Sequence, residues 1–397
     1  MCLTIFVNQL GFGSIVPVVP LYADTFGVSL TMIGMAIAVY GAARFLANVP
    51  TARIADHWGR RQALAVGGSL TVIGSLISAL APDYWMFLFG RFLAGGGASM
   101  VITGGQIVMS DVTVPANRGR VMAIYQGVFM FAVGFGPIPG GFLAEYVGLS
   151  APFWGNALLA AVVALLAWFR VPETRGMSGG VRMTTPVQQL ALRQQARVMF
   201  AQSGFLLIGF VGFSTFFART GGLFNLIPNL GNEQLGLSAG QIGLGLGMIS
   251  LMGLGLAYPS GWLVDRFGRK TVIVPSTIFS GLAMILFAFA PDYLWFMLAS
   301  VVWAISAGIA GAAPNAYAAD MAPPGMNASA MGLFRMVADS GYVAGPFLLG
   351  LSADLLSTTT ALYMTAALVF VSGVAFGLLA PETYSSRAAQ RVAAGDD

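Results

Sequence analysis

Residues Gly261 to Lys270 read GWLVDRFGRK, an apolar run followed by an aspartate, a glycine and three basic side chains. Charge is scarce in the rest of the chain: 9% of the 397 residues are charged and 57% are hydrophobic, whereas soluble domains carry about 25% charged residues. A run of about 20 apolar residues spans a bilayer as a helix, and only helices or closed barrels satisfy the backbone inside lipid. The apolar runs are long and do not alternate with polar residues, so we predict an all-α integral membrane protein.

Breaks that carry charge, proline or glycine divide the chain into twelve predicted transmembrane helices. They cover residues 3–22, 30–52, 62–81, 84–110, 119–146, 151–169, 203–229, 240–264, 271–290, 293–319, 328–353 and 358–380. The first apolar run lacks the cleavage site of a signal peptide, so we expect it to remain as a helix.

The charges outside these spans are distributed unevenly. The basic residues all fall on one side of the membrane, and the opposite loops carry the acidic residues Asp24, Asp83, Glu145, Glu233, Asp292 and Asp354. Cytoplasmic loops of membrane proteins are enriched in Lys and Arg. We therefore expect a multi-pass protein of the cell (plasma or inner) membrane with both termini in the cytoplasm. This asymmetry explains the net charge of +4 better than a nucleic-acid partner does.

The opening stretch has a second copy, ARIADHWGRR, at Ala52 to Arg61. Both copies lie at the same offset of 209 residues, which also separates Asp111 from Asp320. The offset holds without a gap for Ala81-Pro82-Asp83-Tyr84, for Gly136-Pro137 and for Pro172-Glu173-Thr174. A duplicated six-helix unit follows, with bundles at residues 1–174 and 203–383, a cytoplasmic linker at 175–202 and a tail at 384–397. Residues 186–200 form either an amphipathic surface helix or a simple tether.

The repeated loop resembles a motif of the major facilitator superfamily: Gly, three residues, Asp, a basic residue, any residue, Gly, and two basic residues. The first copy has Ala52 and His57 at two of these positions. The resemblance covers essentially the whole chain and lies nearest the twelve-helix drug/proton antiporter group. It implies two bundles related by a pseudo-two-fold axis, which bind a substrate between them and work by alternating access.

The resemblance also implies a cytoplasmic gate, in which this loop latches the two halves together. The implied gate residues are Asp56, Gly59, Arg60, Arg61, Asp111 and Arg120 in the first copy and Gly261, Asp265, Arg266, Gly268, Arg269 and Lys270 in the second. The alternative is that these charges only anchor the helix ends at the interface and set the topology.

Arg91 lies inside the fourth predicted helix, where an arginine costs at least about 2.5 kcal/mol and usually faces a cavity or a partner. With Gly95 four residues on, it resembles a motif that the family links to proton coupling. A purely structural or snorkelling arginine is the alternative.

Arg335 and Asp339 are four residues apart in the eleventh predicted helix and therefore share a face. Asp339 is the only acid well inside a predicted span. We expect it either to carry a proton during the cycle, or to form a permanent structural ion pair with Arg335.

The fifth predicted helix contains Gly136, Pro137, Gly140 and Gly141, which resemble a motif of exporters that exchange substrate for protons. Small residues allow close helix contact, and proline bends a helix. We expect a pivot here, repeated in part at Gly345 and Pro346, or simply small-residue packing.

Further polar residues fall on the helices that line the family's cavity. These candidates are Asn8, Gln9, Tyr40, Arg44, Gln106, Tyr125, Gln126, Arg219, Asn225, Asn315 and Tyr317. Any one of these side chains alone is better explained by a hydrogen bond between packed helices than by contact with a ligand. As a set they predict a mostly apolar cavity, which suits an amphipathic substrate better than a sugar.

Catalytic and cofactor motifs are absent from the sequence. One cysteine (Cys2) and one histidine (His57) build neither a disulfide nor a metal cluster, and no phosphate-binding Gly-Lys-Ser/Thr loop is present. We predict a non-enzymatic, monomeric secondary transporter without a cofactor or nucleotide, which exports small amphipathic compounds in exchange for protons. An importer or uniporter of sugars or organic acids is the alternative, and a membrane receptor or scaffold is a third.

Overall fold

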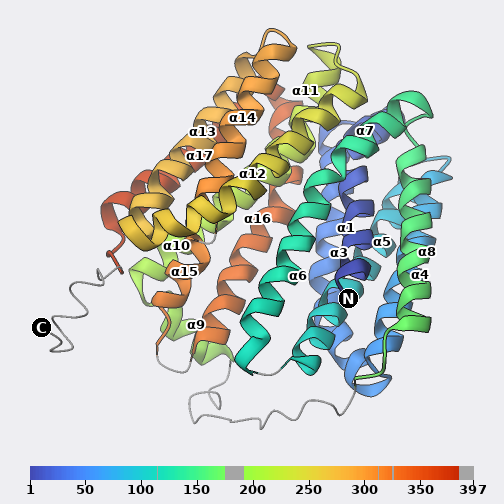
Figure 1. Ribbon diagram of the computed structural model, residues 1–397. Coiled ribbons are helices and arrows are strands. Elements are labelled where there is room, and N and C mark those ends of the chain that lie inside the picture. Colours follow the sequence, from blue (N-terminus) through green and yellow to red (C-terminus); the bar gives the residue numbers. More distant parts are fainter. Residues whose placement is uncertain (114, 175–191, 312, 324–325, 384–397) are drawn as a thin grey trace, which may run out of the picture.

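The computed structural model describes residues 1–397 apart from 114, 175–191, 312, 324–325 and 384–397, and every regular element in those ranges is a helix. Ten helical segments of the described chain are long and apolar enough to cross a bilayer. Two bundles stand side by side, one blue to green and one yellow to red (Figure 1). The bundles correspond to the two halves of the duplicated sequence.

The first half comprises α1 (Cys2–Ile15), α2 (Val19–Asp24), α3 (Leu30–His57), α4 (Arg60–Ala79), α5 (Tyr84–Val112), α6 (Pro115–Phe135), α7 (Pro137–Tyr146) and α8 (Ala151–Arg170). The short helix α9 (Leu192–Phe200) precedes the second half. That half comprises α10 (Ser203–Phe217), the π-helical segment η2 (Ala218–Leu226), α11 (Ile227–Glu233), α12 (Ala239–Phe267), α13 (Arg269–Phe289), α14 (Tyr293–Ala310), α15 (Ala313–Asp320), α16 (Asn327–Leu355) and α17 (Thr358–Leu379). Consecutive segments α1–α2, α6–α7 and α14–α15 each form one rod with a break, whereas α10, η2 and α11 form one continuous helix. The predicted twelve-helix architecture is therefore confirmed.

The breaks in these rods have local causes. Pro17 follows α1, and Pro137 opens α7 directly after Gly136; a proline has no N–H to continue the helical ladder. The break between α14 and α15 falls at Gly311, whose φ of 44° is open to glycine but unfavourable for other residues. The broken rods are thus encoded by proline and glycine.

The duplication is visible in the loops as well as in the bundles. Gly59 and Gly268 both have positive φ, 112° and 93°, and each joins two antiparallel helices. Asp83 caps α5 by accepting from the Met86 N–H at 2.9 Å, and Asp292 caps α14 by accepting from the Trp295 N–H at 3.0 Å. The repeated Pro-Asp-Tyr sequence therefore marks two equivalent helix starts.

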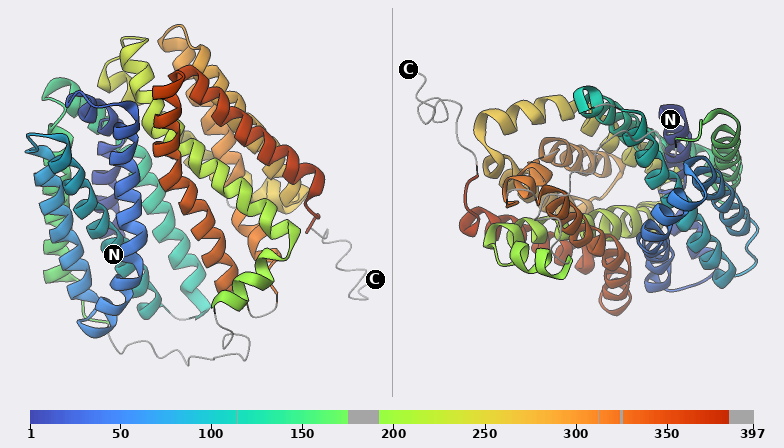
Figure 2. Two further views of the ribbon diagram at one scale, coloured as in Figure 1. Left: turned by 180° about the vertical axis from the view of Figure 1, so that it is seen from behind. Right: turned by 90° about the horizontal axis from the view of Figure 1, so that it is seen from below.

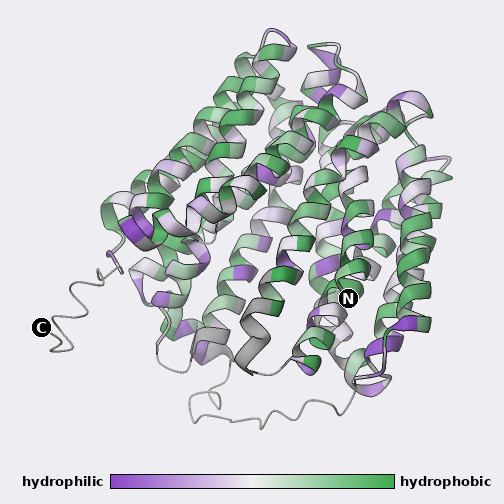
Figure 3. Cartoon of the chain, in the orientation of Figure 1, coloured by the Kyte–Doolittle hydropathy of each residue, from purple (hydrophilic) through white to green (hydrophobic). Residues whose placement is uncertain are grey.

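The outer faces of the bundles are apolar, as Figure 3 shows, with strongly hydrophilic residues gathered mostly near the helix ends. Large apolar side chains are widely exposed, including Leu158 (68%), Phe169 (73%) and Leu378 (78%). Soluble monomers rarely expose apolar surface on this scale, whereas helices that face lipid do.

The two ends of the molecule differ in how the halves meet. We call the end with the Gly59 and Gly268 loops the linker end, and the opposite one the far end. Toward the far end, α3 packs against α16 and α12 packs against α7. A Cβ on Gly34 would collide with the backbone of Pro346 there.

The described hydrogen bonds between the halves lie toward the far end. Nearer the linker end, a Cβ added to Gly127 of α6, Gly255 of α12 or Gly332 of α16 would meet nothing within 4 Å. The two bundles are seen from this end in the right panel of Figure 2. The described chain is therefore closed at the far end and open at the linker end.

Candidate functional site

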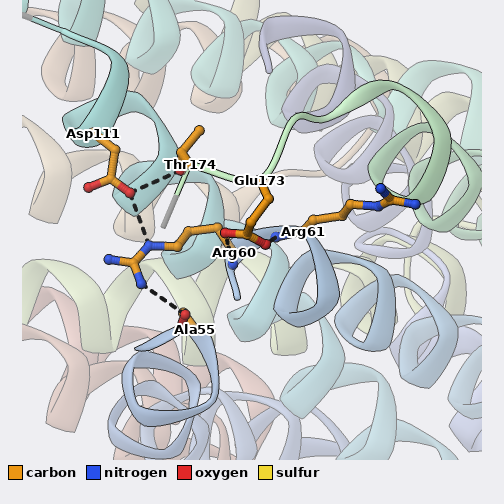
Figure 4. Close-up of polar contacts among 6 residues, drawn as sticks. All are labelled: Ala55, Arg60, Arg61, Asp111, Glu173 and Thr174. Atoms are coloured by element: carbon orange, nitrogen blue, oxygen red, sulfur yellow. Dashed lines mark hydrogen bonds and ion pairs between the residues drawn. The ribbon is translucent and has the colours of Figure 1, made fainter. Parts of the chain in front are cut away.

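The repeated loop of the first half builds a buried ion pair at the linker end (Figure 4). The Arg60 Nε lies 3.0 Å from the Asp111 Oδ2, and the two side chains are only 11% and 8% exposed. The Thr174 hydroxyl donates to the same oxygen at 3.0 Å, and the Arg60 Nη1 donates to the carbonyl of Ala55 at 2.9 Å. This network ties α4 to α5, to the end of α3 and to the segment that follows α8.

A second carboxylate completes the start of α4. Glu173 accepts from the backbone N–H groups of Arg60 and Arg61, at 2.9 and 3.2 Å. A carboxylate at this position satisfies free amides and complements the helix dipole. The Arg61 guanidinium lies 5.0 Å from the centre of the Trp168 ring, so both basic residues contact their own half.

The second half repeats the arrangement. The Arg269 Nε lies 2.9 Å from the Asp320 Oδ2, which also accepts from the Thr383 hydroxyl at 3.1 Å. Lys270 donates to the carbonyl of Ala380 at 2.8 Å, and Arg266 stacks on the Trp262 ring at 5.0 Å.

The remaining predicted gate residues contribute less to the described network. The side chains of Asp56, Arg120 and Asp265 lie outside the described part of the chain, and a Cβ on Gly261 would meet only open space. The ion pairs of the described residues join Arg60 to Asp111 and Arg269 to Asp320, each within one half. Latching between the halves stays a prediction.

At the far end, by contrast, carboxylates cross between the halves. Asp354 of α16 accepts from the N–H of Leu30 at 2.9 Å and from that of Thr31 at 2.8 Å, and it also binds the Thr31 hydroxyl. It therefore caps the start of α3 in the other half. Partial burial alone would raise the pKa of Asp354, but hydrogen bonds from Thr31, Leu30 and Ser29 outweigh it and hold that pKa below its ordinary value.

Glu145 at the end of α7 makes the reciprocal contact. It accepts from the Ser238 hydroxyl at 2.8 Å and from the Gly240 N–H at 3.0 Å, at the start of α12 in the second half. Glu145 and Asp354 occupy equivalent positions of the repeat, as do Ser29 and Ser238. The sequence shows these acids outside the spans, but their role as caps across the halves was not predicted.

Two arginines of the first half, the buried Arg91 and the half-buried Arg44, lie near the interface between the halves. Arg91 of α5 is 4% exposed; its guanidinium lies 4.5 Å from the Tyr40 ring centre, and its Nε donates to the Ala36 carbonyl at 3.4 Å. Arg44 of α3 lies 5.8 Å from the ring centre of Tyr342, which belongs to α16. Tyr342 therefore joins the predicted first-half residues from the opposite bundle.

The second half adds Arg219 and Arg335. Arg219 of η2 lies 5.5 Å from the Phe224 ring centre. Arg335 and Asp339 of α16 form the predicted ion pair at 3.3 Å, with side chains 60% and 28% exposed, and Arg335 also lies 5.7 Å from the Phe216 ring. The Arg335 side chain of this pair is therefore exposed, and that of Asp339 is partly buried.

A small internal cavity lies beside these arginines. It is lined by Phe12, Ile15, Val16, Val19, Ile37, Arg91, Phe224 and Tyr342. A neighbouring cavity is lined by Asn8, Phe12, Ile15, Tyr40, Thr71, Arg91, Ala98 and Asn156. Both lie between aliphatic and aromatic side chains, with a few polar groups and an arginine.

The other predicted cavity residues divide into two groups. Asn8 donates to Gln9 at 2.8 Å, Asn225 to the Pro346 carbonyl at 3.1 Å, and Tyr317 to the Pro381 carbonyl at 2.7 Å. All of these side chains and that of Tyr125 are buried, and Tyr317 packs on Phe376 away from the cavities. The exposed members of the set are Gln106, Gln126 and Asn315.

The predicted pivot coincides with the break between α6 and α7. A Cβ on Gly136 or Gly140 would collide with the backbone of α1, and one on Gly141 with the backbone of Ala239 in the other half. The second-half counterpart is not interrupted: α16 runs through Gly345 and Pro346 as one helix. The glycines therefore serve close packing both within and between the halves.

The sequence profile of the Major Facilitator Superfamily matches residues 1–256 and 208–395. The chain belongs to the Major Facilitator Superfamily. An uncharacterized transporter of this superfamily from Methanocaldococcus jannaschii is 22% identical over 382 residues, covering 94% of this chain and 95% of the relative. The class H tetracycline resistance protein of Pasteurella multocida is 24% identical over 351 residues, covering 86% and 85%.

A solved structure supports the same fold. The inward-facing, unoccupied structure of a bacterial homologue of the human lysosomal transporter Spinster superposes with a TM-score of 0.77, at 15% identity, over 95% of each chain. This member of the Major Facilitator Superfamily is therefore a multi-pass membrane transporter of small molecules, which is a non-enzymatic class of protein.

Proposed function

We propose that this transporter exports small amphipathic compounds in exchange for protons, by alternating access. The arrangement of the halves supports the alternating-access part, because they touch at the far end and separate toward the linker end. Export of amphipathic compounds is supported by the similarity to a tetracycline resistance protein and by the mostly apolar lining of the cavity to which both halves contribute.

The linker end faces the cytoplasm in this proposal. Basic residues gather at that end, including Arg60, Arg61, Arg269 and Lys270, as expected for a cytoplasmic surface. In a Cys2→Ser background, a cysteine replacing Trp58, which is 63% exposed at this end, should react with a membrane-impermeant maleimide in inverted vesicles but not in intact cells. Labelling in intact cells would reverse the orientation.

The observation that carries proton coupling is the Arg335–Asp339 pair, 3.3 Å apart on a predicted membrane span. An arginine nearby favours the ionised form of a carboxylate, whereas an apolar environment without that arginine favours the protonated form. A change in the distance between these two side chains during the cycle would therefore bind and release a proton. Asp339 is the proposed proton carrier, with Arg335 and Arg91 tuning its affinity.

Inverted vesicles loaded with a pH-sensitive dye test this directly. With a transported compound added, wild type should dissipate the imposed proton gradient, whereas Asp339→Asn should reduce proton flux by about a hundredfold, because no other acid lies well inside a span. Asp24→Asn, an exposed acid at the far end, is the matched control and should behave as wild type. Proton flux that persists in Asp339→Asn would contradict the coupling mechanism.

A further inference from the structure

Positive charges outnumber negative charges in the membrane spans of the two halves. Four arginines lie within the membrane spans, and the single acid well inside a span is Asp339. Asp339 is paired with Arg335. Positive charge therefore dominates the space in which the halves face each other.

These positive charges surround one cavity. Arg91 and Tyr342 both line it, and Arg44 lies over the Tyr342 ring. Arg219 lies over Phe224, which lines the same cavity. Arg44 and Arg91 belong to the first half and Arg219 and Arg335 to the second, so the cluster spans the interface.

The protein satisfies these guanidinium groups only in part. No carboxylate of a described residue lies within ion-pair distance of Arg44, Arg91 or Arg219. Their neighbours are aromatic rings, and Arg91 has one long hydrogen bond to a carbonyl. A guanidinium has five N–H donors in a planar fork that fits a carboxylate or phosphate. N–H donors of these arginines therefore remain available to bind an anion that is not part of the protein.

We infer that the substrate is an amphipathic organic anion, whose carboxylate binds among Arg91, Arg219 and Tyr342. Its apolar body extends toward Phe12, Ile15 and Phe224, which line the adjoining cavity. That cavity measures about 10 Å³ in this conformation, so these side chains must move to admit the ligand. A low-dielectric cavity of one charge sign concentrates ligands of the opposite sign. Neutral and cationic analogues with the same body bind more weakly, because they leave the arginines unpaired or repel them.

This inference rests on the proposed transport function and names its substrate class. An anion held by Arg91 of the first half and Arg219 of the second contacts both halves, so its binding favours the halves coming together.

Three probes with one apolar body test the substrate class: pyrenebutyrate, pyrenebutanol and pyrenebutylamine. The full-length protein in nanodiscs of zwitterionic lipid is heated with each probe, and the ligand-induced rise in melting temperature gives an apparent affinity. Pyrenebutyrate should bind about tenfold or more tightly than the alcohol, the worth of a charge-assisted hydrogen bond. Equal affinity for the three probes, or preference for the amine, would overturn the inference.

Variants locate the anion site. Arg219→Gln should weaken pyrenebutyrate binding about tenfold and leave pyrenebutanol binding unchanged, whereas Arg170→Gln, at an exposed helix end, should change neither. If Arg219→Gln is poorly folded, Tyr342→Phe, which keeps the ring and removes the hydroxyl, should still reduce the preference for the anion. An unchanged preference in both variants would contradict the site.

Flux measurements separate this inference from the proposed function. Uptake of pyrenebutyrate and pyrenebutanol into inverted vesicles is followed with and without a proton gradient. Selective binding of the butyrate without any gradient-driven uptake would overturn proton-coupled export and leave the anion site standing. Gradient-driven uptake of the alcohol alone would overturn the anion site and leave export standing.

Discussion

The linker end and the far end of this transporter use the same chemistry in opposite ways. At the linker end, Asp111 and Asp320 each bind an arginine of their own half. At the far end, Glu145 and Asp354 each bind the first turn of a helix in the other half. Both pairs are related by the duplication of the sequence. Carboxylates at the linker end therefore hold each bundle together, and those at the far end join the two bundles.

The two kinds of carboxylate contact should behave differently during transport. If the halves rock as rigid bodies, the pairs within one half persist throughout the cycle, while the contacts across the halves are lost whenever the far end opens. The first kind of carboxylate should then affect stability, and the second kind should affect the balance between conformations.

The largest expected effect is on stability at the linker end. Asp111→Asn removes the charge beside Arg60 in a pair that is 11% and 8% exposed, and it should destabilise the protein by about 3 kcal/mol. Asp320→Asn acts on the equivalent pair, but that pair is 21% and 30% exposed, so about 1 kcal/mol or less is expected. Thermal unfolding of the purified variants compares them. Equal losses would show that burial does not distinguish the two copies.

A smaller effect is expected from packing at the far end. Gly243 of α12 faces the backbone of Pro137, so Gly243→Ala should force the halves apart there at a cost of about 1–3 kcal/mol. Gly253→Ala lies on the same helix with nothing within 4 Å, and it should be neutral or stabilising by up to about 1 kcal/mol, because alanine favours helix. The melting temperatures of the two variants test this difference. A Gly243→Ala protein as stable as wild type would contradict the close contact.

The smallest effect is expected from pH. The lowered pKa of Asp354 means that its contact with Thr31 is present above the ordinary carboxyl pKa of about 3.9, and is lost only as pH falls through the lower value. Closure of the far end through Asp354 should therefore not change between pH 5 and pH 8. Site-directed fluorescence quenching at Leu356, which is 64% exposed, measures this. Opening within that range would show that the carboxyl titrates higher than its hydrogen bonds imply.

Much of the fold could be predicted from the sequence because it depends on local or repeated signals. Apolar run length determines the spans, and the constant offset between copies determines the two bundles. Arg60 and Asp111 were both expected among the gate residues from the family resemblance, and the pairing of Arg335 with Asp339 followed from their spacing along one helix. Each of these features is a property of one half.

The contacts across the halves could not be predicted in the same way. The sequence shows Glu145 and Asp354 at equivalent positions, but it does not show which surface of the other half each one meets. Tyr342 has Val133 at its equivalent position, so the repeat gives no signal for it. The proposed role of Tyr342 depends on nearby arginines from both halves, which come together only in the folded protein.

The central claim is that Glu145 and Asp354 hold the far end closed. Spin labels at Val147 and Leu356, which are 71% and 64% exposed in opposite halves, report their separation by pulsed electron resonance in a Cys2→Ser background. With each cap worth about 1 kcal/mol, the Glu145→Gln/Asp354→Asn variant should raise the ratio of long to short distances about 30-fold. Asp83→Asn/Asp292→Asn, which removes two caps within single halves, should leave the ratio at the wild-type value. Indistinguishable distance distributions in wild type and the Glu145→Gln/Asp354→Asn variant would contradict the account.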